Sequence, residues 1–154
     1  MVGFAPDEID QSAPTRAARL KWVVVVDGAL PAGRAANAAV CTAAATSQAV
    51  AGLLGDDAVD ADGHAHPGLP WAGCTVLTAD AATLRAVRAK AAARPDFFVA
   101  DMPAAAQHTR VYSEYLKAVG DTGADGFDYY AVSIVGPRNP VDKLVSKLPL
   151  LAPS

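Results

Sequence analysis

The sequence predicts an α/β fold, a three-layer sandwich around a four-stranded mixed β-sheet. Three observations favour this class. Residues 23–26 are four consecutive valines. A strand of β-branched residues that no polar residue interrupts is typically covered on both faces of the sheet. Residues 35–55 carry no charge and place apolar side chains at helical spacing. Strand-like and helical segments alternate along the rest of the chain, which is the pattern of layered α/β domains.

The length and composition fit one folded unit. A chain of 154 residues that is 52% hydrophobic and 19% charged has enough apolar side chains for a single core. We therefore expect a single α/β domain at 20–154. The segment 1–19 mixes prolines, acids and small residues without a period, which predicts a flexible N-terminal arm. Phe4 and Ile9 are the residues of this arm that we expect to pack on the domain.

Charge and cysteine content narrow the classes of function. A net charge of −3 and a pI near 5.5 argue against a nucleic-acid partner, because such binders normally carry a cationic excess. Cys41 and Cys74 form no CxxC pair, which favours a reducing cytoplasm. The first residues include acids and no apolar core of signal-peptide length. Polar residues inside the uncharged segment argue against a membrane-spanning helix. We therefore predict a cytoplasmic protein with no membrane partner.

The first strand begins at Lys21 and ends at Asp27 and Gly28, and a long helix follows it. We predict this helix over 35–55, where small residues let its backbone approach a sheet or a partner closely. The large apolar residues that we expect along one side of it are Val40, Val50 and Leu54.

The remaining elements follow from turn residues and apolar spacing. Glycine and proline make 56–73 a loop region, with Asp62 and Gly63 at a hairpin tip. Asp80 is a suitable N-cap for one helix, and Asn139 is a suitable cap for the last helix, with Pro140 in its first turn. The predicted ranges are strands at 74–79, 97–100 and 129–135, helices at 80–94 and 104–119, and a loop at 120–126.

The loop at 28–35 has two glycines at the spacing of a phosphate-binding loop between a strand and a helix. Arg34 stands where the lysine belongs, and Ala35 replaces the Ser or Thr that would hold magnesium. We therefore interpret the loop as a plain turn and expect no cofactor. The free amides of the helix start, together with Arg34, still suit an anion or a carboxylate.

His64 and His66 lie beside Asp60 and Asp62, which raises the hypothesis of a metal site. In an extended strand the two imidazoles would share a face and could hold zinc or nickel, but the sequence shows no evident third ligand. The spacing does not fit a calcium loop. We therefore predict a solvated hairpin tip without a metal.

Nucleophilic catalysis has little support. The sequence has no GxSxG motif, and Ser133 lies in the middle of a predicted strand. Cys41 lies in the apolar run, which predicts a buried thiol. His108, Asp101 and Tyr112 could form an acid–base group near the sheet edge, although residues of these types more often cap a helix and face water. We therefore assign no catalytic residue.

Two stretches resemble the peptidyl-tRNA hydrolase type II fold. KWVVVVDGALPAGRAANAAVCTAA at 21–44 is similar to that family's strand, loop and long helix. YYAVSIVGPRNPVDKLVSKLPLL at 129–151 is similar to its last strand, Gly-Pro turn and Lys-Leu-x-Leu tail. LPAGRAANAA and GPRNPVDK resemble still more closely small bacterial proteins catalogued as a domain of unknown function within that fold. The resemblance implies a bacterial, peptidyl-tRNA hydrolase II-like domain.

The same resemblance argues against hydrolase activity. The lysine that the hydrolases use in the first turn of the long helix falls at Ala36, and Arg34 is the nearby cation. Their Asp-Ala-Gly-Arg-Thr segment is matched only in part, from Asp121 to Asp125. Without the lysine, the ester and the attacking water lose an electrostatic partner.

Our leading hypothesis is a non-hydrolase member of this fold that binds a small ligand or a peptide at the start of the long helix. The alanine-rich surface of that helix and the apolar tail favour a homodimer. One alternative is a hydrolase with relocated catalytic residues, using Arg34 with Asp121 or His108. Another is a metal-binding accessory protein that uses His64 and His66. The predicted ligand-binding residues are Gly33, Arg34, Asn37, His108 and Asp121.

Overall fold

Strand β1 (Leu20–Asp27) lies in the middle of a four-stranded mixed sheet, as the valine run predicts. The computed structural model describes residues 1–151 and orders this sheet β4–β1–β6–β5. β1 runs parallel to β4 (Thr75–Ala79). β6 (Tyr129–Pro137) runs antiparallel to both β1 and β5 (Phe98–Pro103). β6 therefore opposes the other strands of this sheet in direction.

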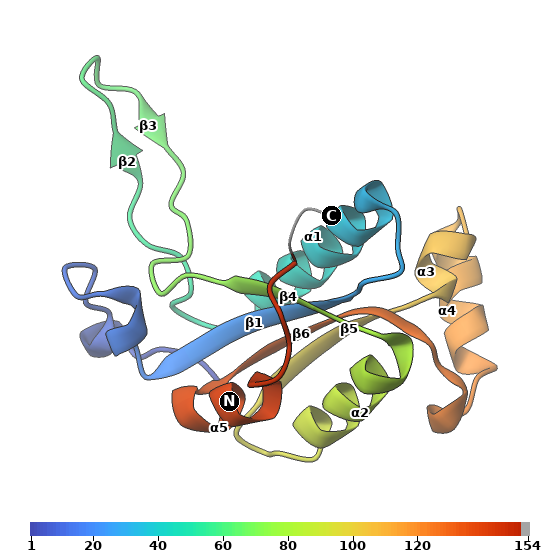
Figure 1. Cartoon of the computed structure of the whole chain (residues 1–154). Coiled ribbons are helices and arrows are strands. Elements are labelled where there is room, and N and C mark those ends of the chain that lie inside the picture. Colours follow the sequence, from blue (N-terminus) through green and yellow to red (C-terminus); the bar gives the residue numbers. More distant parts are fainter. Residues whose placement is uncertain (152–154) are drawn as a thin grey trace.

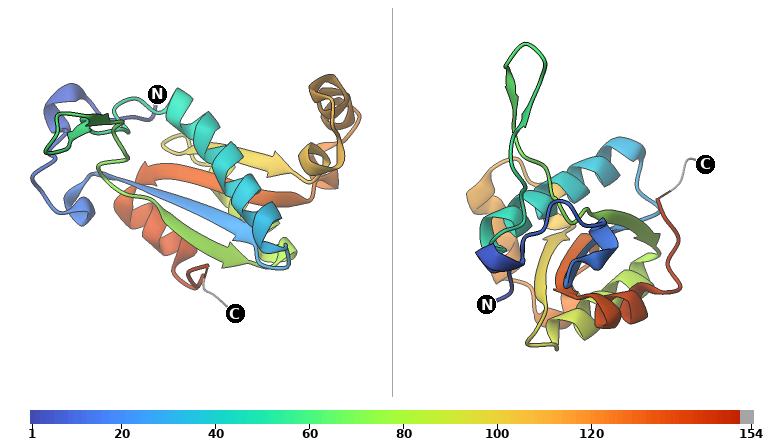
Figure 2. Two further views of the ribbon diagram at one scale, coloured as in Figure 1. Left: turned by 90° about the horizontal axis from the view of Figure 1, so that it is seen from above. Right: turned by 90° about the vertical axis from the view of Figure 1, so that its left-hand side faces the viewer.

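Helices cover both faces of the sheet, which confirms the predicted layers (Figure 1). α1 (Ala32–Ala49) crosses one face, and α2 (Ala81–Ala92) and α5 (Arg138–Val145) lie on the other (Figure 2). α3 (Ala105–His108) and α4 (Tyr112–Gly120) lie together beyond the end of β5. No helix within residues 1–151 is long and apolar enough to cross a bilayer. Short 3-10 turns occur at Pro6–Glu8, Thr15–Ala17 and Ala124–Gly126.

The valines of β1 alternate between two cores. Val24 and Val26 belong to the core under α1. Val23 and Val25 belong to the core under α2 and α5. Successive residues of a strand point to opposite faces, so an all-valine strand supplies apolar side chains to both cores. The four side chains are at most 2% exposed, which explains why no polar residue interrupts the run.

α1 packs on the sheet through small residues rather than through large ones. Its buried residues are Ala35, Ala38, Thr42 and Thr46. Val40 is 67% exposed, so the predicted apolar side of this helix is wrong. The helix also ends at Ala49 and not at 55, because the next residue is extended and buries its side chain in the core. Small residues on the inner side let the helix backbone lie close to the strands.

A chain of buried polar groups joins α1 to the sheet. Nε1 of Trp22 donates to Ser133 Oγ at 2.8 Å. Ser133 Oγ lies 2.7 Å from Thr46 Oγ1, and Thr46 Oγ1 donates to the backbone oxygen of Thr42 at 2.7 Å. Because Thr46 has a single hydroxyl proton, Ser133 donates to Thr46. These four side chains are buried, and each of their polar groups has a partner.

Residues 1–19 lie against the domain. Gly3 pairs with Ala51 in an isolated bridge. The Phe4 ring is buried against Trp71, with ring centroids 4.7 Å apart, so the expected packing of Phe4 is confirmed. Arg19 forms an ion pair with Glu8 at 2.9 Å. The flexibility of this segment stays a prediction.

The segment between α1 and β4 forms a hairpin that projects from the domain (Figures 1 and 2). β2 (Ala58–Val59) pairs with β3 (Ala65–His66), and Asp62 and Gly63 lie at the tip, as predicted. Gly63 has a φ of +86°, a conformation that glycine adopts without strain. Every residue from 56 to 67 is exposed, so the hairpin adds nothing to either core.

The helix predicted at 104–119 is wrong as a single element. Thr109 and Val111 adopt extended conformations, and they separate α3 from α4. Both residues are β-branched, and such residues are less suited to a helix than to extended backbone. The break redirects the chain, so that α4 faces α1 across a gap rather than continuing α3.

The predicted cap of the last helix is also wrong. α5 begins at Arg138, with Pro137 and not Asn139 at the N-cap position. The amide of Arg138 donates to the backbone oxygen of Arg19 at 3.0 Å. This contact between distant segments fixes where the helix begins. Pro140 lies in the first turn, where a helix needs no amide hydrogen.

Candidate ligand pocket

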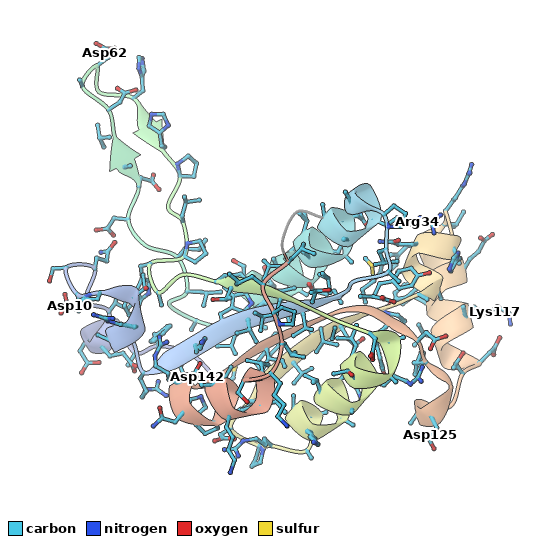
Figure 3. The ribbon with its side chains drawn as sticks, in the orientation of Figure 1. Asp10, Arg34, Asp62, Lys117, Asp125 and Asp142 are labelled. Carbon is cyan, nitrogen blue, oxygen red and sulfur yellow. The ribbon has the colours of Figure 1, made fainter. Side chains whose placement is uncertain are left out.

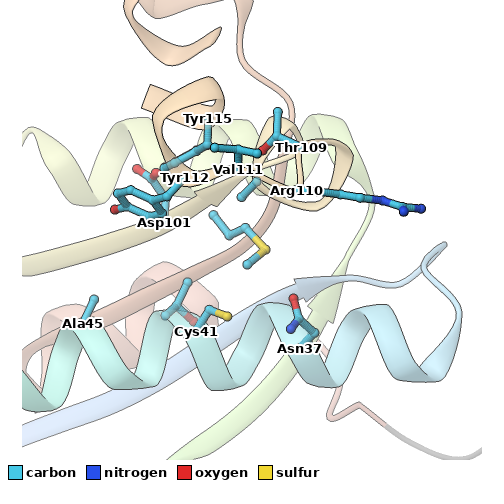
Figure 4. A pocket seen from close by; sticks show the side chains of 12 residues that line it. Asn37, Cys41, Ala45, Asp101, Thr109, Arg110, Val111, Tyr112 and Tyr115 are labelled. Atoms are coloured by element: carbon cyan, nitrogen blue, oxygen red, sulfur yellow. The ribbon is translucent and has the colours of Figure 1, made fainter. Parts of the chain in front are cut away.

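A cavity of about 590 Å³ lies between α1 and α4 (Figure 4). α1 forms one wall, and α4 with the preceding link forms the other. The end of β5 forms the floor. The polar side chains that line the cavity belong to Asn37, Cys41, Thr42, Asp101, Thr109, Arg110, Tyr112 and Tyr115.

Asn37, Cys41 and Ala45 form the α1 wall. They are four residues apart, so they lie above one another on one side of the helix. The inner side of α1 is fixed by the packing of Ala38 and Thr42 on the sheet, which leaves this side free. Figure 4 shows the side chains of Asn37 and Cys41 pointing toward the cavity.

Asp101 and Met102 form the floor. The carboxylate of Asp101 accepts a hydrogen bond from Arg88 Nε at 3.1 Å, and its side chain is 21% exposed. The Arg88 guanidinium also lies 5.3 Å from the centre of the Tyr129 ring, so two contacts hold it in place. The register of β5 on β6 shifts between Met102 and Pro103. The floor therefore combines a fixed carboxylate with an apolar thioether.

Tyr112 and Tyr115 form an aromatic wall on α4, with ring centroids 5.4 Å apart. Partial burial raises the pKa of the Tyr115 phenol, and the negative charge of Asp101 raises this pKa further. The Tyr115 hydroxyl therefore stays protonated at neutral pH and can donate a hydrogen bond. A ligand in the cavity would meet flat apolar rings on one side and polar groups opposite.

An amide pair lies beside the cavity, next to a shallow depression lined by Gly33 and Arg34. Nε2 of Gln107 donates to the backbone oxygen of Arg34 at 2.9 Å and to Asn37 Oδ1 at 3.2 Å. This orientation leaves the Asn37 amide nitrogen available as a donor. Gln107 Oε1 is buried and has no hydrogen-bond partner among residues 1–151.

The sequence model of a family described as a protein of unknown function, DUF2000, matches residues 20–152. The chain belongs to the DUF2000 family. The solved structure of Atu0240, a protein of unknown function from Agrobacterium tumefaciens strain C58, is similar to this DUF2000 protein with a TM-score of 0.77 and 18% identity. The match covers 87% of this chain and 98% of Atu0240, and at this identity it establishes the shared fold alone. No curated protein sequence matches the chain significantly.

The structure brings together three of the predicted binding residues of this DUF2000 protein. Gly33, Arg34 and Asn37 line the shallow depression, and Asn37 also lines the larger cavity. His108 and Asp121 line neither of these two depressions. His108 Nε2 lies 2.9 Å from the Tyr130 hydroxyl. Asp121 accepts a hydrogen bond from Lys117 at the end of α4, at 2.6 Å.

The prediction that Cys41 is buried is wrong, because Cys41 is exposed and lines the cavity. The error follows from the inverted orientation of α1 in the prediction. Of the suggested acid–base group, Asp101 and Tyr112 do line one cavity, whereas His108 does not. Two of the three suggested acid–base residues therefore share one cavity, and His108 lies outside it.

Residues 28–31 form a turn and α1 begins at Ala32, three residues before the predicted start at 35, so the interpretation of this loop as a turn that opens a helix is supported. The amide of Gly28 donates to the backbone oxygen of Ala79 at 3.0 Å. The amide of Ala29 donates to Asp27 Oδ1 at 2.9 Å. These two amides are therefore engaged within the protein and do not face a phosphate.

Sequence reasoning missed Arg110 and Tyr115 as pocket residues. They lie on the far wall, and their position depends on the break between α3 and α4. The β-branched residues at 109 and 111 were the available signal for that break. Met102 was missed because the strand was predicted to end at 100, two residues before it.

Proposed function

We propose that this DUF2000 protein is a small-ligand or peptide-binding homodimer with a peptidyl-tRNA hydrolase II-like fold but without hydrolase activity. The observation that carries the proposal is the cavity between α1 and α4. Its volume of about 590 Å³ lies within the range of about 300 to 1,000 Å³ that is typical of small-molecule sites. Its few polar groups face an aromatic wall, which is also typical of such sites.

The lining indicates the kind of ligand. The Tyr112 and Tyr115 rings suit a flat apolar group, and Asn37 offers an amide for hydrogen bonding. Arg110 lies at the rim with its guanidinium directed away from the cavity, and the Asp101 carboxylate on the floor is paired with Arg88 (Figure 4). A compact molecule that carries a flat apolar group together with hydrogen-bonding groups, such as an amino acid or a short peptide, matches this arrangement.

A thermal-shift screen of amino acids, short peptides and other small metabolites tests the binding proposal. We expect at least one class to raise Tm, and calorimetry on the best compound to show one site. Tyr112→Ala and Asn37→Ala should each weaken binding by about tenfold, or about 1.4 kcal/mol. Gln48→Ala, on the exposed side of α1 outside the cavity, is the matched control. A panel without any shift, or a compound bound equally by all three variants, contradicts the proposal.

The catalytic lysine of the hydrolases falls at Ala36, on the exposed side of α1. The relocated alternative needs Arg34 to act with Asp121 or His108. Asp121 is paired with Lys117 and His108 with Tyr130, so the contacts favour binding over this alternative. We expect no release of peptide from a peptidyl-tRNA substrate. Release at a rate that falls in Arg34→Ala would overturn this part of the proposal.

The exposed side of α1 supports the homodimer. Ala36, Val40 and Ala44 are exposed at helical spacing, and Leu150 and Leu151 are exposed apolar residues elsewhere. We expect light scattering to give twice the monomer mass and Val40→Arg to reduce it to the monomer mass. Ala89→Arg, which adds the same charge at an exposed position of α2 on the opposite face of the sheet, should leave the dimer intact. A wild-type protein that stays monomeric at working concentration contradicts the dimer.

We place the protein in a reducing compartment, which agrees with a cytoplasmic location. Cys41 and Cys74 are both exposed free thiols. Exposed thiols are open to oxidation, so they are better suited to a reducing environment than to an oxidising one.

A further inference from the structure

The β2–β3 hairpin carries four side chains that can bind metals within seven consecutive residues. Asp60, Asp62, His64 and His66 alternate with Ala61, Gly63 and Ala65 at its outer end. Figure 3 shows Asp62 at the tip, far from Arg34 at the start of α1. Any site here is therefore separate from the pocket proposed above.

Three of these residues direct ligand atoms to one point. One ligand atom each from Asp60, Asp62 and His64 lie within 4.8 Å of one another. Asp60 Oδ2 lies 3.4 Å from His64 Nδ1 and 3.2 Å from His66 Nε2. In a tetrahedral zinc site with bonds of about 2.0 to 2.1 Å, neighbouring ligand atoms are about 3.3 Å apart. The two separations from Asp60 Oδ2 are therefore close to the spacing of neighbouring ligand atoms in such a site, although the Asp60–His66 pair is hydrogen-bonded here.

The two carboxylate oxygens of Asp60 have different partners in the turn. Oδ1 accepts hydrogen bonds from the amides of Asp62 and His64, both at 2.9 Å. Oδ2 is left to face the two imidazoles. An ionised carboxylate beside two imidazoles is a donor set for a divalent cation.

We propose that the hairpin tip binds one zinc ion through Asp60, Asp62 and His64, with His66 as the fourth ligand. His66 lies outside the three-residue cluster and reaches it by rotation of a side chain that is 63% exposed. Imidazole ligands select zinc over calcium and magnesium, which prefer oxygen ligands. Residues 56–66 contain four aspartates and no lysine or arginine, so the local charge attracts a cation.

Titration of metal-free protein with Zn²⁺ tests the proposal. We expect calorimetry to show one site per chain. Asp60→Asn, His64→Ala and His66→Ala should each weaken the affinity by about tenfold or more. All three residues are exposed, so the variants should keep the wild-type Tm without metal. Absence of binding, or unchanged affinity in His64→Ala or in His66→Ala, overturns the proposal.

Two controls separate the hairpin from other zinc ligands. His108→Ala removes the third histidine of the chain, which lies in α3, and should not change the affinity. Cys41→Ser/Cys74→Ser removes both exposed thiols and should also bind normally. Co²⁺ in the same site should show visible d–d bands without a thiolate charge-transfer band. Loss of binding in either control, or a thiolate band, overturns the proposal.

Discussion

Ser133 shows how one small polar residue fixes the position of a helix on a sheet. It accepts a hydrogen bond from Trp22 of β1 and donates to Thr46 of α1. All three side chains are at most 7% exposed, so an unpaired group among them would be costly. The sequence suggested that Ser133 is simply packed, and its role as the junction of three elements was not visible in the local pattern.

Ser133→Ala should destabilise the protein by about 1 to 3 kcal/mol, because it leaves the Trp22 N–H without an acceptor. Urea unfolding measures the loss. Trp22→Phe should lower the free energy of unfolding less in the Ser133→Ala protein than in the wild type. In the double variant both the donor and the acceptor of the hydrogen bond are absent, so no buried group is left unpaired. Ser113→Ala, at an exposed serine of α4, is the control and should change stability by at most about 0.5 kcal/mol. An equal loss of unfolding free energy on Trp22→Phe in the wild type and in Ser133→Ala would contradict the hydrogen bond between Trp22 and Ser133.

Gly136 is required for space rather than for conformation. A Cβ at this position would lie 2.3 Å from Cδ1 of Phe97, which is buried under β6. Gly136→Ala should therefore cost about 1 to 3 kcal/mol by overpacking, measured by urea unfolding. Gly120→Ala, which meets no atom within 4 Å, should be neutral or slightly stabilising. Phe97→Leu should recover part of the loss in Gly136→Ala, and failure to do so would point to another cause.

At the scale of elements, the sequence predicted the strands better than the helices. A strand is fixed by short-range properties such as β-branching and bounding turn residues, so the four sheet strands were found within a few residues. α1 was found but turned to the wrong side, because large apolar residues were assumed to face inward. Close approach of α1 instead buries alanines and two hydrogen-bonded threonines, and this depends on the sheet that it covers.

The candidate site was predicted only in part, because some of its residues follow from local sequence signals and others depend on contacts between distant segments. Asn37 and the neighbouring turn follow from the start of α1, which is a local signal. Arg110 and Tyr115 reach the cavity because the chain reverses between α3 and α4 and returns toward α1. Such a meeting of segments about seventy residues apart leaves no trace in the spacing of either segment.

α2 begins with a cap whose charge makes it sensitive to acid. Asp80 accepts a hydrogen bond from the Thr83 amide at 2.7 Å, and this amide lowers the pKa of the Asp80 carboxyl. The stabilisation is present above the ordinary carboxyl pKa and is lost as pH falls through the lowered one. We expect Asp80→Ala to lower Tm at neutral pH, with a smaller difference from wild type in strong acid.

Asp80→Asn separates the hydrogen bond from the charge, because asparagine also caps helices well. Its Tm at neutral pH should lie close to wild type, and its advantage over Asp80→Ala should persist in acid. Circular dichroism melts across a pH series provide the comparison. A constant difference between wild type and Asp80→Ala at every pH would rule out titration of this cap.

At the scale of the whole molecule, the hairpin and the domain are separable. Ala58 and His66 are paired across the hairpin, so a two-glycine turn can join the flanking residues in place of 58–66. All of the residues removed are exposed, so we expect Tm to change by only a few degrees. Zinc binding should be lost, whereas a ligand of the α1–α4 cavity should bind as before. A large fall in Tm, or loss of the cavity ligand, would show that the two parts depend on each other.

The central place of β6 has a consequence for the chain as it leaves the ribosome. β5 pairs within this sheet with β6 alone, and β6 also fills one side of β1. Both strands are synthesised before residues 129–137 exist, so β5 lacks its partner strand and β1 keeps one unpaired edge in the nascent polypeptide. Sheet closure is thus a late event of synthesis, and until then these edges are open to pairing with another chain.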